Sequence, residues 1–360
     1  MMQTRKFTDL YIDTTKKGTK ISQDRYLSTG RYPIVDQGRQ IIAGYWDETD
    51  GIFDEVPAII FGDHTRAIKY IEEPFFIGAD GVKILRPVNE EDNPKYLYYA
   101  LQAAKIPNLG YSRHFKVVKE LEMRIYSRED QDAIVNKIER IDCLIEKRQD
   151  ELIYLDELVK SRFIELFGDI IGNRTLPLIR LSELADIGSS KRIYANEYVE
   201  SGIPFYRSKE IRELGTGLKP SVELFIKRER YDEIREKYGV PKVGDILIAA
   251  IGATIGYSWI VDTDSPFYYK DGNLIVLSIK DNVNPIFLNH AMGILIEDFK
   301  KKGVAGSAQL ALTIEKLEKM MVVNPELELQ NQFAAFVAQV DKSKYCRCKS
   351  SRLLQRVASI

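Results

Sequence analysis

Apolar positions recur most regularly in the middle of the chain, between Ile134 and Leu166. Alternating steps of four and three residues from Ile134 reach ten positions, of which eight are apolar and two are Arg148 and Arg162. This spacing is typical of the heptad seam of a coiled coil and predicts one long helix over about 129–168. The predicted seam residues in this helix are Ile134, Ile138, Ile141, Ile145, Leu152, Leu155 and Val159.

A long amphipathic helix lying on a globular core is the alternative interpretation of the same pattern. However, 33 residues rising 1.5 Å each would extend roughly 50 Å, which is longer than most cores need. The spacing therefore favours a helix that pairs with another helix.

A second helix is predicted over 326–360, with an apolar start that fades along its length. Its seam residues are Phe333, Val337 and Val340. The first helix carries a net charge of −5 over 129–168, whereas residues 341–356 carry +5. Opposite charges favour pairing, although each exposed ion pair contributes little. We expect the two helices to pack antiparallel against each other.

The chain also repeats itself around these helices. "YLSTGRYPIVDQG" is similar to "YVESGIPFYRSKE", "PFFIGADGVKILRP" to "PFYYKDGNLIVLSI", and "REDQDAIVNKIERID" to "LELQNQFAAFVAQVD". The three pairs occur in the same order, at offsets of 172, 192 and 199 residues. This order indicates a duplicated unit that consists of one domain followed by one helix.

Before each helix, over 1–126 and 175–324, the pattern is one of short strands and turns, with turn dipeptides such as Asp80-Gly81 and Asp271-Gly272. We also expect short helices at 94–104 and 285–299, and a strand-turn-strand at 246–261 rather than a membrane span. The predicted fold class is α+β, with two mixed αβ domains and two long helices. The predicted segments are 1–126 for the first domain, 127–170 for its helix, 175–324 for the second domain and 325–360 for the second helix.

Composition narrows the class of protein. The 360 residues are 44% hydrophobic, which is enough for two hydrophobic cores. The formal net charge of −1 argues against a uniformly basic chain. Three cysteines give no disulfide framework, and the N-terminus has no apolar secretory segment, so we expect a reducing cytoplasm and no membrane partner. Cys346 and Cys348 have no second ligand pair nearby, so no metal site is expected.

Catalytic motifs are missing from the sequence. No phosphate-binding Gly-x-x-x-x-Gly-Lys-Ser/Thr loop is present. "NPKY" at Asn93 resembles the Asn-Pro-Pro-Tyr motif of adenine methyltransferases, but a helix start with proline in its first turn explains it better. Asp63 and His64 could be a catalytic pair, although no nucleophile motif accompanies them.

Three stretches of the second copy resemble the specificity subunits of Type I restriction-modification systems. "RLSELADIGSSKRIYANEYVESGIPFYRSKEI" resembles the opening of a target recognition domain, "VGDILIAAIGATIGYSWIV" its glycine hairpin, and "GSAQLALTIEKLEKMMVVNPELELQNQFAAFVAQVD" its exit into a helix. The resemblance spans nearly the whole chain and is strongest over 178–341. The first copy departs from it, with "IIFGDHTRAIKYI" in place of the hairpin and "GYSRHFKVVKELEMRIYS" at the exit.

The resemblance implies a non-catalytic protein that reads a split site on double-stranded DNA. Each domain would read one half-site, and the paired helices would set the gap. Methyltransferase (M) and restriction/translocase (R) subunits would be partners and would bind S-adenosylmethionine, ATP and Mg. The alternative is a DNA-reading fragment of a self-sufficient DNA methyltransferase or restriction enzyme.

Candidate DNA contacts lie in polar and basic loops, because base edges are read by Arg, Lys, Asn, Gln, Ser or Thr supported by phosphate contacts. Residues 14–39 carry a net charge of +4 and residues 187–242 a net charge of +3. "TTKKGTK" and "GSSKRIY" occupy matched places in the two copies. Ordinary solvated loops and turns are the alternative for each residue. The candidates are Lys16, Lys17, Lys20, Arg39, His64, Thr65, Arg66, Arg113, His114, Ser189, Ser190, Lys191, Arg192, Arg207, Lys209, Thr254, Ser307 and Gln309.

Overall fold

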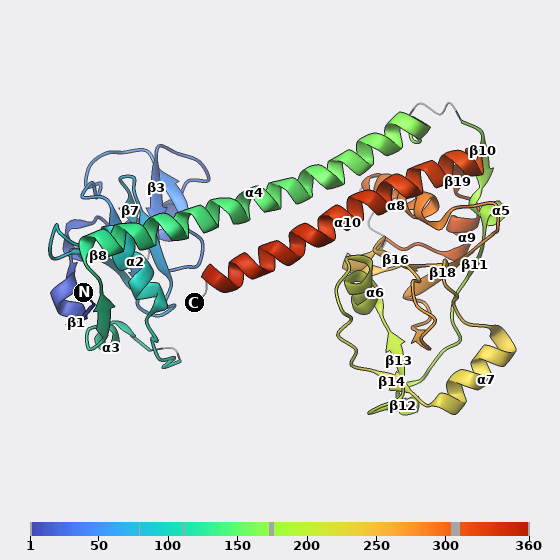
Figure 1. The fold of residues 1–360 in the computed structure, drawn as a ribbon, viewed down its shortest axis with the longest axis horizontal. Helices are drawn as coiled ribbons and strands as arrows, with labels where there is room; N and C mark the ends of the chain where they lie inside the picture. The colour runs from blue at the N-terminus through green and yellow to red at the C-terminus, as the bar shows by residue number, and fades with distance from the viewer. Residues whose placement is uncertain (1, 79, 111, 173–175, 304–309, 359–360) are drawn as a thin grey trace. The chain divides into compact units, whose positions relative to one another are not determined.

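The computed structural model describes residues 2–78, 80–110, 112–172, 176–303 and 310–358 (Figure 1). The chain divides into two compact units. The first comprises residues 1–146 with 354–360, and the second comprises residues 147–353.

The first unit contains three small sheets. A four-stranded antiparallel sheet has the order β2-β8-β5-β6, a three-stranded sheet has the order β4-β3-β7 with β3 and β7 parallel, and β1 pairs with β9. The strands are β1 Gln3–Lys6, β2 Tyr11–Asp13, β3 Tyr32–Val35, β4 Gly44–Trp46, β5 Ala58–Gly62, β6 Ile68–Ile71, β7 Phe76–Ile77, β8 Val82–Pro87 and β9 Glu122–Ile125.

Three short helices and one long helix accompany these sheets. The helices are α1 Phe7–Leu10, α2 Pro94–Ala103, α3 Phe115–Val118 and α4 Arg128–Phe167. The Asn93 side chain accepts hydrogen bonds from the backbone N–H groups of Lys95 and Tyr96, and Pro94 occupies the first turn of α2. This N-cap confirms the interpretation of "NPKY" as a helix start.

The second unit repeats the plan. Its four-stranded sheet has the order β11-β18-β15-β16, a second sheet has the order β12-β14-β13-β17, and β10 pairs with β19. The strands are β10 Leu178–Arg180, β11 Ala185–Gly188, β12 Tyr198–Val199, β13 Ile203–Tyr206, β14 Phe225–Ile226, β15 Ile246–Ala249, β16 Ser258–Ile260, β17 Tyr268–Tyr269, β18 Leu274–Ile279 and β19 Met321–Val323. The matching strand orders confirm the internal duplication.

The helices of the second unit include two that the first unit lacks. They are α5 Leu181–Leu184, α6 Ser208–Gly215, α7 Arg228–Tyr238, α8 Pro285–Gly303, α9 Ile314–Glu318 and α10 Leu327–Ala358. Helices α6 and α7 lie in the segment between β13 and β15, whereas the segment between β3 and β5 of the first unit forms only β4 and loops. The predicted strand-turn-strand at 246–261 is confirmed as β15, a short turn and β16.

The central strands lie in the cores of the two units. All five residues of β5 and all four of β15 are buried. Strands covered on both faces need apolar side chains at every position, which explains the continuous runs "AIIFG" and "ILIA". The rigid sheets therefore carry the polar loops that follow β5 and β15.

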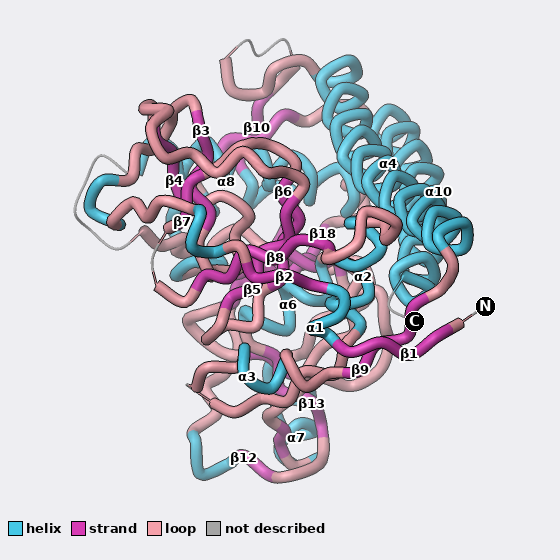
Figure 2. The backbone as a smooth tube through the Cα atoms, turned by 90° about the vertical axis from the view of Figure 1, so that its left-hand side faces the viewer, coloured by secondary structure: helices cyan, strands magenta, loops and turns pink. Residues whose placement is uncertain are grey.

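Helix α10 lies alongside the part of α4 that belongs to the second unit (Figure 2). The contacts between the two helices show that they run antiparallel. Going from Phe163 back to Asp156 on α4, the partners on α10 advance from Phe333 to Lys344. The Phe163 and Phe333 ring centroids lie 5.3 Å apart, and the Lys344 ammonium lies 2.6 Å from the Asp156 carboxylate. The fold class predicted from the sequence, with long helices packing antiparallel, is confirmed.

The predicted seam residues lie on two different cores. Val159, Phe333, Val337 and Val340 are buried in the core of the second unit, and Leu155 packs against it. Ile134 packs against the core of the first unit. Ile138, Ile141, Ile145 and Leu152 are half-buried, and their role as seam residues stays a prediction.

Candidate nucleic-acid interface

Gln37 connects three loops of the first unit, those after β3, after β5 and between β7 and β8. Its side-chain amide donates to the Asp80 carbonyl at 2.8 Å and accepts from the His64 N–H at 3.3 Å. The Thr65 hydroxyl donates to the Gln37 carbonyl, and the Lys20 ammonium pairs with the Asp80 carboxylate. The structure therefore brings the predicted residues Lys20, His64 and Thr65 together.

A buried lysine binds the residue that precedes Gln37. Lys69 on β6 is only 4% exposed and donates to the Asp36 carbonyl at 2.7 Å, with the Asp36 carboxylate at 3.4 Å. Burial is the main cause that lowers the pKa of Lys69, and the nearby Asp36 opposes it. This contact fixes the start of the loop that carries Gln37 and Arg39.

Arg66 and His114 have structural roles in the same region. Arg66 adopts a φ of 60° and its guanidinium donates to the Ile106 carbonyl at 3.2 Å. His114 is fully buried, with Nδ1 2.9 Å from the Asp63 carbonyl and Nε2 accepting from the Leu109 N–H at 3.2 Å. The His114 ring is therefore enclosed within the first unit.

The backbone contact of His114 has a counterpart in the second copy. The His114 N–H donates to the Asp63 carbonyl just after β5, and the Leu312 N–H donates to the Ala250 carbonyl just after β15, both at 2.9 Å. Leu312 is also buried. His114 is fully buried at this contact, and its role as a DNA contact stays a prediction.

The other predicted residues of the first unit are exposed. Lys16, Arg39 and Arg113 have exposed side chains. The Lys17 ammonium lies 2.5 Å from the Glu55 carboxylate, which also pairs with Arg86 at 2.7 Å. Lys17 would have to exchange this carboxylate for a phosphate to contact DNA.

In the second unit, the predicted loop after β11 lies beside the turn between β17 and β18. The Arg192 guanidinium pairs with Asp271 at 2.8 Å, and the Lys191 N–H donates to the Tyr268 hydroxyl at 2.7 Å. Ser189, Ser190 and Lys191 line a cleft of about 450 Å³ together with Tyr238. The Lys191 ammonium lies 4.3 Å from the centroid of the Tyr238 ring.

A second basic cluster surrounds Glu223. Arg207 and Lys209 bind its carboxylate at 2.8 and 2.7 Å, and Arg207 also binds the buried Glu210 at 3.0 Å. The hydrogen bonds that Arg207 donates to Glu210 and Glu223 raise its pKa. Those that Glu223 accepts from Lys209 and Arg207 lower the pKa of Glu223 to about 2. Carboxylates within the unit therefore neutralise part of the charge of the two basic residues.

Three candidate DNA contacts of the second unit remain, Thr254, Ser307 and Gln309. The Thr254 hydroxyl donates to the Ile251 carbonyl at 3.4 Å in the turn between β15 and β16. Ser307 and Gln309 lie outside the residues that the structure describes.

One arrangement recurs in both units. A basic residue from the loop after the outer strand pairs with the aspartate of an Asp-Gly turn, as Lys20 with Asp80 and Arg192 with Asp271. Both turns need a positive φ, 87° at Gly81 and 70° at Gly272, which favours glycine there. The Asp-Gly dipeptides were the sequence signal for this shared feature.

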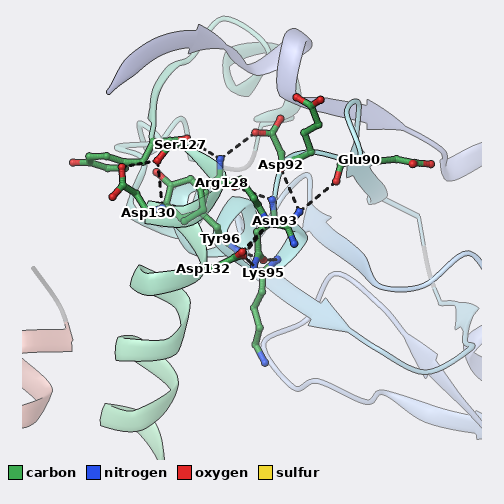
Figure 3. Close-up of polar contacts among 12 residues, drawn as sticks. Glu90, Asp92, Asn93, Lys95, Tyr96, Ser127, Arg128, Asp130 and Asp132 are labelled. Carbon is green, nitrogen blue, oxygen red and sulfur yellow. Dashed lines mark hydrogen bonds and ion pairs between the residues drawn. The ribbon is translucent and has the colours of Figure 1, made fainter. Parts of the chain in front are cut away.

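The polar junction between α2 and α4 was not predicted from the sequence (Figure 3). The Asn93 N–H donates to the Gln131 side-chain carbonyl at 2.7 Å, and the Asn93 amide donates to the Asp132 carboxylate at 2.6 Å. The Gln131 amide in turn donates to the Tyr126 carbonyl at 3.0 Å. Asn-Pro before a short helix and a glutamine in the first turns of a long one, both present twice, could have indicated it.

The described residues contain no group of three or more His, Cys, Asp or Glu side chains arranged to hold a metal ion. Within the same residues, no helix combines the length and apolar character that crossing a membrane requires.

The fold and the loop clusters define a class, a duplicated α+β protein in which each globular unit presents polar and basic loops and continues into a long helix. The sequence model of the Type I restriction modification DNA specificity domain matches residues 175–346. Residues 175–346 of the chain therefore form a domain of this family.

Two curated proteins are similar to parts of the chain. A protein of Haemophilus influenzae named as a Type I restriction enzyme specificity subunit is 32% identical over 163 residues, 44% of this chain and 39% of that protein. The EcoR124I/EcoR124II specificity subunit of Escherichia coli is 33% identical over 79 residues, 21% of this chain and 20% of that protein. The aligned segments thus span well under half of either relative.

Solved structures share the fold over almost the whole chain. The S subunit of a Type I restriction-modification system from M. genitalium superposes with a TM-score of 0.58 at 18% identity, covering 99% of this chain and 94% of that one. A chain from a study of complex assembly of the Type I system gives 0.61 at 16% identity, covering 99% and 95%. At these identities the likeness concerns the fold alone.

Proposed function

We propose that this chain is a DNA specificity subunit that reads a bipartite site on double-stranded DNA. The observation that carries the proposal is the duplication. Two domains with the same strand order each present a cluster of polar and basic loops, and each continues into a long helix. Two copies of one reading unit suit a site that consists of two half-sites.

Each loop cluster would combine two kinds of contact. Exposed lysines and arginines such as Lys16, Arg39 and Arg113 would neutralise phosphates, and the hydroxyl and amide groups of the loops would read base edges. Lys20 and Arg192 are held by Asp80 and Asp271, so their side chains start from defined positions. Preorganised side chains lose less conformational entropy on binding.

Methyl transfer, cleavage and translocation would reside in partner M and R subunits, which would bind S-adenosylmethionine, ATP and Mg. The outer side of α4 offers a docking surface for such a partner. Ile153, Tyr154 and Ile164 are 55, 66 and 56% exposed, next to the exposed acidic residues Asp150 and Glu157. Large apolar side chains exposed at this density on one helix favour a protein partner.

The proposal is tested by assembling the chain with its methyltransferase and sequencing DNA for methylated adenine. We expect one bipartite motif. A contiguous motif, or none, would contradict the proposal. Methyl transfer by the isolated chain with S-adenosylmethionine would instead favour a self-sufficient enzyme.

Single substitutions test the loop clusters. Arg192→Ala should weaken DNA binding roughly ten-fold and reduce the salt dependence by about one phosphate contact. Lys319→Ala is the matched control, because Lys319 is exposed, pairs with Glu315 on the short helix α9 and is not among the predicted DNA contacts. Equal losses in the two variants would remove Arg192 from the interface.

A further inference from the structure

The polar junction of the first unit has a twin in the second. The Asn284 N–H donates to the Gln330 side-chain carbonyl at 2.8 Å, and the Asn284 amide donates to the Asn331 side-chain carbonyl at 2.8 Å. The Gln330 amide donates to the Pro325 carbonyl at 2.9 Å. These bonds repeat those of Asn93, Gln131 and Asp132, donor for donor.

Each asparagine joins two helices. The Asn284 carbonyl oxygen caps α8 by accepting from Ile286 at 2.9 Å and Phe287 at 3.4 Å, while its amide reaches α10. Asn93 caps α2 in the same way and reaches α4. We call each set of an asparagine, a glutamine and the residue after it a clasp.

Burial of the two glutamines makes the hydrogen bonds of the clasps costly to break. Gln131 and Gln330 are each 1% exposed, and both their carbonyl and amide groups are satisfied inside the clasp. A buried amide left without partners costs more than the bond itself contributes, so a rotation of the short helix against the long one is opposed. Apolar packing alone tolerates small rotations more easily, because it is not directional.

The angle at a clasp is amplified by the length of the helix. Helix α4 has 40 residues. At 1.5 Å per residue it is roughly 60 Å long, so a tilt of about 10° at one end would move the other end by roughly 10 Å. That distance is about three base pairs of B-DNA.

We propose that the two clasps are positioning elements that fix the gap between the half-sites, with Asn93, Gln131, Asn284 and Gln330 as the residues that set the angle between each reading domain and its helix. This inference rests on the proposed bipartite reading. The length of the gap between the half-sites would then depend on the two junctions as well as on the number of residues in the helices.

The sharpest variants are Asn93→Ser and Asn284→Ser, tested in the assembled methyltransferase complex. Serine caps a helix about as well as asparagine, so the short helix should persist. The side-chain bond to Asp132 or Asn331 of the long helix is lost, while the backbone N–H can still donate to the glutamine. We expect methylation at the same half-site bases, with the gap relaxed to include neighbouring lengths. The rate at the original gap should fall roughly five- to ten-fold, equivalent to one hydrogen bond.

Two controls separate positioning from stability. Thr313→Ala removes the N-cap of α9 and leaves the clasps untouched. It should lower the melting temperature without changing the gap. Asp132→Asn copies Asn331 of the second clasp and keeps an acceptor for the Asn93 amide, so it should keep the original gap.

Asp132→Ala and Asn331→Ala remove the acceptor alone and give a second route if a serine variant fails to fold. A unique, unchanged gap in the folded clasp variants would overturn the inference while leaving the proposed function intact. A wild-type complex without a bipartite motif would instead overturn the proposed function. A change in the half-site bases themselves would assign the clasp to base reading and contradict the positioning role.

Discussion

The two junctions keep the same clasp but surround it differently. In the first unit the residue before the clasp asparagine is Asp92, which is 5% exposed and binds Arg5 at 2.8 Å and the Gln131 amide at 3.1 Å. In the second unit it is Val283, which is also 5% exposed but packs in an apolar core. The duplication thus preserved the directional bonds, while the neighbouring position became charged in one copy and apolar in the other.

The second junction adds aromatic packing that has no hydrogen bonds. Phe163 of α4 lies 5.9 Å from Phe287 of α8 and 5.3 Å from Phe333 of α10, measured between ring centroids. Three helices of the second unit therefore meet at one aromatic cluster. Each unit also contains one of the two tryptophans, Trp46 and Trp259, so their fluorescence can report on the unfolding of the two units separately.

The largest effect is expected from exchanging the two environments. Val283→Asp would place a carboxylate in an apolar core without a basic partner and should destabilise the second unit by about 4 kcal/mol or more. Urea unfolding followed by Trp259 fluorescence in a Trp46→Phe background measures this. A loss below about 1 kcal/mol would mean that the second junction tolerates charge as the first does.

Removing one ring of the aromatic cluster should have the next largest effect. Phe163→Ala should cost the second unit about 3–4 kcal/mol, since it removes buried area and leaves a cavity among the helices. The control is Tyr154→Ala on the same helix, where the side chain is 66% exposed and the change should stay within about 0.5 kcal/mol. The same urea titration compares the two.

The ion pair of the first junction should contribute less. Asp92→Asn keeps the shape of the side chain and removes its charge beside Arg5, whose side chain is 24% exposed. We expect a loss of about 1–2 kcal/mol for the first unit, because solvent screens the exposed part of the pair. Trp46 fluorescence in a Trp259→Phe background measures it, and an unchanged midpoint would make the pair dispensable.

The smallest effect is a pH dependence of the second unit. Burial is the main cause that lowers the pKa of His290, and the bond to the Ile286 carbonyl and the charge of Asp341 oppose it, whereas Lys344 adds to it. The unfolded chain therefore binds a proton that the folded unit disfavours. Stability should be full above the ordinary histidine pKa of about 6.5 and should fall as the pH drops through that value toward the folded pKa.

Unfolding of the second unit at pH 7.5, 6.5 and 5.5 tests this, with His290→Leu as the comparison. The variant should have a flatter stability profile over that range. An identical slope in both proteins would assign the pH dependence to other groups.

The sequence predicted what depends on periodicity or on a local motif. The seam from Ile134 indicated α4, and the apolar runs indicated β5 and β15. Phe163 and Phe167 were missed, because they lie beside the seam and are buried by α8 as well as by α10. A heptad count considers one partner helix, and the structure supplies two.

Polar residues were harder to interpret from the sequence. His114 was expected in an exposed loop, but its backbone pairs with Asp63 and places the ring in the core. Arg207 and Lys209 looked like two basic residues in a positive stretch, but both share Glu223, which follows them by more than ten residues. Burial and ion pairing of this kind depend on contacts between segments that a linear pattern does not contain.

The small sheets β1-β9 and β10-β19 give the molecule a modular layout. In each, the strand that enters a domain pairs with the strand that leaves it, as Gln3 with Ile125 and Leu178 with Val323. The chain therefore leaves each domain next to the point where it entered. Genetic recombination with crossovers at such a sheet would exchange a whole reading domain in one event, and the inherited helix would keep its length and its register.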